Sequence, residues 1–117
     1  MISEYVLFAL PYGITRAEVV AGMHEVAPRW QAEPDLIRKT FIYDAAEGQA
    51  GAFYLWKNKA SAERAHGPAW RERIRRTYGS EPVIRYFETP LVVDNALGTL
   101  VTEKARDPLA PGARAGT

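Results

Sequence analysis

The chain has 117 residues, of which 47% are hydrophobic, and it contains no cysteine. This length suits one domain with an ordinary core, and the lack of thiols excludes a disulfide scaffold, a thiolate metal site and a cysteine nucleophile. Fifteen basic and fourteen acidic residues leave a net charge of +1, which argues against a nucleic-acid-binding protein. Neither a membrane span nor a signal peptide is evident in the sequence, so we expect a cytoplasmic protein with no membrane partner.

The first half of the chain predicts a strand, a helix and a β-hairpin. Residues 4–10 are rich in strand formers and stop at a Pro-Tyr-Gly turn. Thr15 and Glu18 form a capping-box sequence that starts a helix. Four large side chains then share one helical face, and two prolines end the helix before residue 35: Val19, Met23, Val26 and Trp30, with Pro28 and Pro34. Residues 36–44 and 50–56 follow as a hairpin.

The second half predicts a broken helix and a last strand. Asn58 is a helix N-cap, and Gly67-Pro68 interrupts the helix, which resumes at Pro68 and runs to about residue 77. Residues 82–89 read as a strand, with a short extension after Pro90. We therefore expect one domain over residues 1–95. The composition of residues 96–117 predicts a mobile or loosely docked tail.

The order of these elements predicts an α+β fold in which a strand-helix-strand unit occurs twice. This order is typical of the ferredoxin-like split βαβ arrangement, a four-stranded antiparallel sheet with two helices on one face. The strands are apolar on both sides: Phe53 and Leu55 alternate with Tyr54 and Trp56. Helices cover only one side of such a sheet, so a second copy of the sheet is expected on the other. The sequence thus predicts a homodimer formed through the sheet faces.

The chain also resembles the dimeric α+β barrel superfamily that includes the antibiotic-biosynthesis monooxygenases, and it is most similar to the YdhR-type branch. The resemblance covers about residues 4–94 and rests on four segments: residues 34–39, 51–56, 61–65 and 83–88. It implies two sheets packed face to face and a pocket between each sheet and its own helices. Members of the superfamily oxidise aromatic polyketides without a cofactor, degrade haem, or have no known activity.

One residue departs from the pattern of the superfamily. The cofactor-free members that form quinones have an Asn four residues before a Trp at the end of the third strand. Trp56 matches that Trp, whereas Ala52 stands at the position of the Asn. The resemblance therefore does not transfer the role of that amide to this chain.

The candidate catalytic residues are His66 and Asn58. His66 shares a helical line with Ala62 and Trp70, so its imidazole is expected on the inward side of the helix break, where it could act as a general base. The alternative is a histidine that bonds a free carbonyl at the helix end. Asn58 could polarise a substrate oxygen, and the alternative is that its side chain only caps the helix.

Six further residues are candidates for contacts with a small aromatic or apolar ligand: Trp56, Trp70, Tyr54, Tyr43, Tyr86 and His24. Trp56 could stack on a flat ligand or fill core volume. The tyrosines could offer hydroxyl groups to the ligand or lie in the dimer interface. His24 borders the apolar face of the first helix. No carboxylate lies at ligand spacing from either histidine, so we expect no metal site; an axial haem ligand is the alternative.

These residues support three hypotheses about function. The first is a cofactor-independent, monooxygenase-like enzyme that removes a proton from a small aromatic or polyketide-like compound, so that the carbanion reacts directly with dioxygen. The second is a dimeric protein that binds a small apolar ligand without turnover. The third is a domain whose dimer surface is its main function. The basic residues between Lys57 and Arg76 are interpreted as a solvated helix face, because Arg64, Arg71 and Arg75 share one outward side of the helix. No phosphate-binding loop accompanies them.

Overall fold

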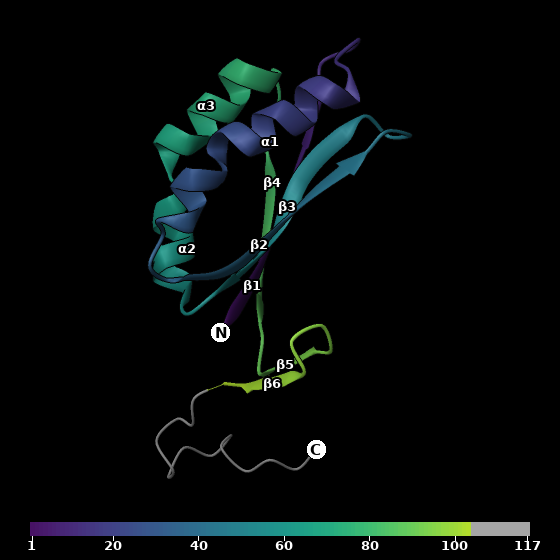
Figure 1. Ribbon diagram of the computed structural model, residues 1–117. Coiled ribbons are helices and arrows are strands. Elements are labelled where there is room, and N and C mark those ends of the chain that lie inside the picture. The colour runs from purple at the N-terminus through teal and green to yellow at the C-terminus, as the bar shows by residue number, and fades with distance from the viewer. Residues whose placement is uncertain (104–117) are drawn as a thin grey trace.

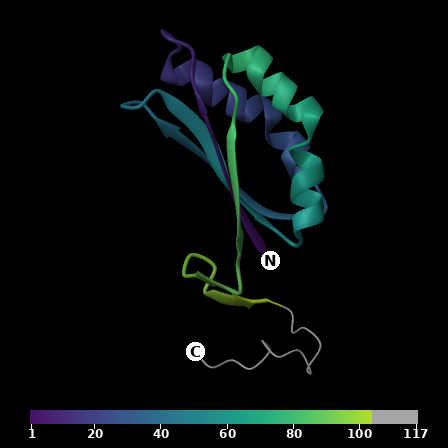
Figure 2. The ribbon, with the colours of Figure 1, turned by 180° about the vertical axis from the view of Figure 1, so that it is seen from behind.

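The computed structural model describes residues 1–103 and contains a four-stranded antiparallel sheet with helices on one face (Figure 1). The strands are β1 (Ile2–Ala9), β2 (Leu36–Asp44), β3 (Gln49–Trp56) and β4 (Val83–Glu88). They lie in the order β2-β3-β1-β4, which is the ferredoxin-like order. The helices are α1 (Arg16–Gln31), α2 (Lys59–Ala65) and α3 (Pro68–Tyr78). The predicted fold class is confirmed, and in the view from behind the second sheet face carries no helix (Figure 2).

Helix α1 begins at the predicted capping box. The Glu18 N–H donates to Thr15 Oγ1 over 3.2 Å, and the Thr15 N–H donates to Glu18 Oε1 over 3.1 Å. The helix passes through Pro28 and ends at Gln31. Proline removes one hydrogen bond there, but Trp30 is buried in the core at the end of the same turn, which keeps the last turn in place.

The predicted break between the second and third helices is also present. Asn58 caps α2, because its Oδ1 atom accepts a hydrogen bond of 2.8 Å from the Ser61 N–H. Helix α3 starts again with Pro68 in its first turn, and Gly79 ends it with a φ of 77°. His66 is the residue that caps the C-terminus of α2, so the break places its side chain where two helical segments meet the sheet.

An irregularity in β2 decides which of its side chains face the helices. Leu36 lies opposite Trp56, but Arg38 lies opposite Leu55, so one extra residue is inserted between them. Such a bulge shifts all later side chains to the other face of the strand. Lys39 therefore points to the same side as Leu36, beneath the helices, and pairs with Tyr54 of β3.

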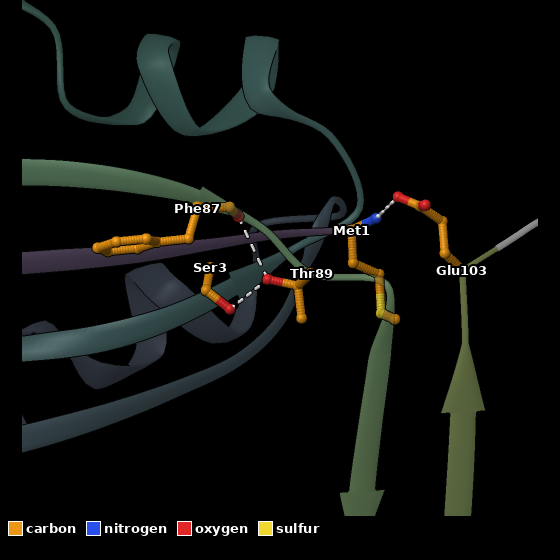
Figure 3. A network of polar contacts seen from close by, with 5 residues as sticks. All are labelled: Met1, Ser3, Phe87, Thr89 and Glu103. Atoms are coloured by element: carbon orange, nitrogen blue, oxygen red, sulfur yellow. Dashed lines mark hydrogen bonds and ion pairs between the residues drawn. The ribbon is translucent and has the colours of Figure 1, made fainter. Parts of the chain in front are cut away.

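The chain continues after β4 into a two-stranded hairpin, β5 (Leu91–Asp94) and β6 (Thr99–Thr102), which lies beyond the end of the main sheet (Figures 1 and 2). The hairpin is tied back to the start of β1. The Met1 ammonium group lies 3.0 Å from the Glu103 carboxylate, and the hydroxyl groups of Ser3 and Thr89 are 2.6 Å apart (Figure 3). Part of the segment expected as a tail thus forms β6, and residues 104–117 lie outside the described residues.

Gly51 lies in β3 at a point where the backbone of β1 is very close. A Cβ atom at this position would lie 1.9 Å from the carbonyl oxygen of Val6. We expect Gly51→Ala to push the two strands apart and to lower the free energy of unfolding by about 1–3 kcal/mol, as overpacking does. Urea unfolding measures this change. Gly67→Ala is the control, because its new Cβ would meet nothing closer than 3.5 Å; equal losses in both variants would contradict the explanation.

Candidate functional site

A cavity of about 430 Å³ lies between the inner face of the sheet and helices α1 and α3. Its volume is within the range of small-molecule sites, and such sites are mostly apolar with a few polar groups. Six aromatic side chains line it: Phe8, Trp30, Phe41, Tyr54, Trp70 and Tyr78. Val26 on α1 is 38% exposed although it belongs to the apolar helix face, because it borders this cavity.

Lys39 extends from β2 into the aromatic wall of the cavity. Its Nζ atom lies 4.0 Å from the ring centre of Trp30, 4.1 Å from that of Phe41 and 4.8 Å from that of Tyr54. Burial, together with repulsion from Arg29, lowers the pKa of Lys39 to about 7, although the Glu4 carboxylate acts in the opposite direction. A substantial fraction of the amine is therefore unprotonated near neutral pH and can accept a proton from a ligand.

A buried polar cluster lies behind the cavity and centres on Glu4. The Trp56 Nε1–H donates a hydrogen bond of 2.8 Å to Glu4 Oε1. His66 Nδ1 lies 2.8 Å from Glu4 Oε2, an ion-pair distance, although the two groups lack the alignment of a hydrogen bond. His66 Nε2 has no hydrogen-bond partner within residues 1–103. Both side chains are fully buried, so this cluster joins β1 and β3 to the break between α2 and α3.

The tyrosines next to this cluster hold their protons firmly. Burial, the charge of Glu4 and a hydrogen bond to Glu4 together raise the pKa of Tyr86 to about 12. Burial also raises the pKa of Tyr54 well above its ordinary value, with a smaller contribution from Glu4. Both hydroxyl groups are thus hydrogen-bond donors at neutral pH and cannot serve as bases there.

The structure divides the candidate residues between the cavity wall and the layer behind it. Tyr54 and Trp70 line the cavity. Trp56 and His66 are fully buried and do not belong to its lining. The imidazole packs against the rings of both wall residues, with ring centres 4.7 Å from Tyr54 and 4.4 Å from Trp70. A ligand in the cavity can reach His66 only if one of these rings moves.

The other candidates lie away from the cavity lining. Asn58 is exposed and uses its side chain to cap α2 and to contact Asp35 over 3.4 Å. His24 is exposed on α1. Tyr43 lies near the end of β2, opposite Ala50, and is partly buried. Within residues 1–103, no three His, Asp or Glu side chains form a set that could hold a metal ion.

Lys39 and Glu4 were missed by the sequence reasoning, although each leaves a signal in its strand. Glu4 alternates with Val6 and Phe8, so the inward face of β1 begins with a carboxylate. Lys39 alternates with Phe41 in the same way. A charged residue in register with an apolar face is rarely buried without a partner or a function. Alternation counted backward along β2 from Phe41 places Lys39 on the inward face, because the bulge lies before Lys39.

The sheet order, together with the aromatic cavity beneath the helices, defines a ferredoxin-like α+β protein with the fold of the antibiotic-biosynthesis monooxygenases. A "putative antibiotic biosynthesis monooxygenase" from Deinococcus radiodurans superposes with a TM-score of 0.62 at 12% identity, over 80% of this chain and 97% of that one. SnoaB, a cofactor-independent oxygenase from Streptomyces nogalater, superposes with a TM-score of 0.58 at 15% identity, over 79% and 95%. At these identities the likeness concerns the fold.

The sequence itself matches the family described as "Putative mono-oxygenase ydhR" over residues 7–89, and the chain belongs to this monooxygenase family. No match to a curated protein sequence was found. No helix within residues 1–103 is long and apolar enough to cross a membrane. The resemblance inferred from the sequence is therefore confirmed.

The lowered pKa of Lys39 has a consequence for stability. An unfolded lysine keeps the ordinary pKa of 10.5, whereas the folded value is about 7. Between these two values the unfolded chain binds more protons, so the free energy of unfolding should rise with pH across this window. Between these two pH values, the free energy of unfolding of the wild-type protein should rise by a few kcal/mol more than that of Lys39→Met. Urea unfolding at several pH values measures this. Lys57→Met, at an exposed lysine, should follow the wild-type curve; parallel curves for Lys39→Met and wild type would contradict the burial of the amine.

Proposed function

We propose that this protein is a cofactor-independent monooxygenase that oxidises a small aromatic or polyketide-like compound in the cavity between the sheet and the helices. The observation that carries the proposal is Lys39, a lysine with a pKa of about 7 inside an aromatic cavity. Flat rings of a substrate match the walls formed by Trp30, Tyr54 and Trp70. Membership of a monooxygenase family and the likeness to SnoaB support the class of reaction.

In this proposal the neutral amine of Lys39 acts as the general base. It removes a proton from an acidic carbon of the bound aromatic compound and becomes an ammonium ion. A general base is most effective when its pKa lies near the working pH, which holds for Lys39 and not for the buried tyrosines. His66 is the competing candidate for this role, and it requires movement of Tyr54 or Trp70.

The carbanion then reacts with dioxygen without an external reductant. Its electron pair forms a carbon–oxygen bond, and the resulting peroxide takes a proton from the Lys39 ammonium ion. Lys39, neutral again, removes the second hydrogen of the same carbon as a proton. The electron pair of that C–H bond forms the carbonyl group, the oxygen–oxygen bond breaks, and the departing hydroxide takes the proton from Lys39 to give water. One CH₂ group and one O₂ thus give one C=O group and one H₂O. The four electrons that reduce dioxygen all come from the substrate.

Oxygen consumption with anthrone and naphthoquinol as probes tests this assignment. We expect wild-type protein to consume one O₂ per anthrone oxidised without accumulating hydrogen peroxide, and kcat/KM to rise as pH increases through about 7. Lys39→Met should lower kcat by about 10²-fold or more, the usual contribution of a general base.

Two further variants separate the alternatives. Lys57→Met removes an exposed lysine and should leave turnover unchanged. His66→Gln should reduce turnover less than Lys39→Met does. The reverse order would identify His66 as the general base that removes the substrate proton. Tight binding of both probes with no oxygen consumption would favour the ligand-binding alternative.

The second sheet face supports a homodimer as the working form of the protein. Phe53, Val83 and Phe87 are 52%, 56% and 44% exposed on this face. Tyr5 stacks on Phe53 with ring centres 5.2 Å apart, so these two rings form one joined apolar surface on this face. An apolar sheet face of this kind is covered most simply by a second copy of the same face about a two-fold axis.

Phe53→Asp tests the dimer. The aspartate would place a charge in a dry contact at a cost of several kcal/mol, so the variant should sediment as a folded monomer at micromolar concentration. The control is Tyr12→Asp, which changes an exposed aromatic side chain in the turn after β1 and should stay dimeric. A monomeric wild-type protein at the same concentration would exclude this interface.

A further inference from the structure

Basic side chains from three elements meet at the cavity. Arg29 of α1, Lys39 of β2 and Arg73 of α3 all line it. Arg29 lies close enough to affect the other two: its charge contributes to lowering the pKa of Lys39 and, after burial, that of Arg73. Arg29 also lies over the ring of Trp30, 5.4 Å from its centre. The helices thus bring two arginines, and the sheet one lysine, to the same cavity.

These cations have no acidic partners of their own. Within residues 1–103, Arg29, Lys39 and Arg73 form no ion pair or hydrogen bond with another side chain. The outward arginines of the same helix behave differently, because Arg75 and Arg76 both contact Glu72. Helix α3 therefore pairs Arg75 and Arg76 with an acid and leaves Arg73 at the cavity without one.

The acidic groups near the cavity do not balance this charge. Glu25 lines the cavity one helical turn before Arg29, yet it lies beyond the ion-pair distance of 4.0 Å from any basic group of residues 1–103. Glu4 is buried behind the wall with His66 and Trp56. The cavity thus has two arginines at its rim, a lysine in its wall and a single acid in its lining. Repulsion among like charges favours a bound anion, and a rim of this sign attracts anions from solution.

We propose that the ligand of this cavity is an aromatic carboxylate, whose ring packs between the aromatic walls and whose carboxylate binds Arg29 and Arg73 at the rim. This inference rests on the proposed function only in taking the ligand as the substrate. Guanidinium groups bind carboxylates through paired hydrogen bonds, which gives orientation as well as attraction. With the carboxylate held at the rim, the ring extends inward toward Lys39. The two arginines therefore act as positioning residues for the group that Lys39 deprotonates.

The test compares binding of naphthoate with that of naphthamide, a neutral compound of nearly the same shape, by quenching of tryptophan fluorescence. We expect wild-type protein to bind naphthoate at least about tenfold more tightly than naphthamide, with a preference that weakens as salt increases. Arg73→Gln and Arg29→Gln should each reduce this preference severalfold and leave naphthamide binding unchanged. Arg76→Gln, an exposed arginine of the same helix, is the matched control and should keep the full preference.

Equal affinities for the two probes in the wild-type protein, or an unchanged preference in Arg73→Gln, would overturn the inference, as would the failure of both probes to bind. The experiment requires no turnover. Loss of oxygen consumption in Lys39→Met with an intact preference for naphthoate supports both proposals. A preference for naphthoate in a protein that never consumes oxygen would contradict only the proposed oxygenase activity. Turnover of neutral phenols without a preference for naphthoate would contradict only this inference.

Discussion

The buried carboxylate of Glu4 is the group on whose contacts the rest of the site depends. It lies on the inner face of the central strand and reaches both the Trp56 indole of β3 and the His66 imidazole at the helix break. A carboxyl group removed from water in this way is costly unless it has polar partners, and loss of one partner would leave a buried polar atom unsatisfied. The cluster therefore favours one specific arrangement of the sheet relative to the helices. The cavity walls are built directly on it, because Tyr54 and Trp70 pack against His66.

This arrangement also explains why the helix is broken after residue 65. A continuous helix would carry His66 and Trp70 on one straight line along the sheet. The break at Gly67 ends α2 with His66 as its C-cap and begins α3 with new backbone geometry. His66 can then enter the core toward Glu4, while α3 runs beside α1 and supplies Trp70 and Arg73 to the cavity. The local break at Gly67-Pro68 thus places His66 in the core and Trp70 and Arg73 at the cavity.

The sequence predicted the elements well because their signals are local. The capping box at Thr15, the cap at Asn58 and the break at Gly67-Pro68 each depend on residues within one turn, and all three are present. The bulge in β2 has no such signal, because it arises from pairing with a strand more than ten residues away. The ionisation of Lys39 depends on neighbours from α1 and β1, and these neighbours meet only in the folded chain.

Desolvation divides the basic groups of the cavity into two kinds. Lys39 lies in the aromatic wall, where the loss of water lowers the pKa of its amine into the physiological range. Arg29 and Arg73 are exposed at the rim, and a guanidinium group keeps its proton under all ordinary conditions. A lysine at the rim would be fully charged and useless as a base, and an arginine in the wall would remain a buried cation. The arginines thus provide a permanent charge that attracts the ligand at the entrance. The lysine provides a titratable group that reacts with the ligand inside.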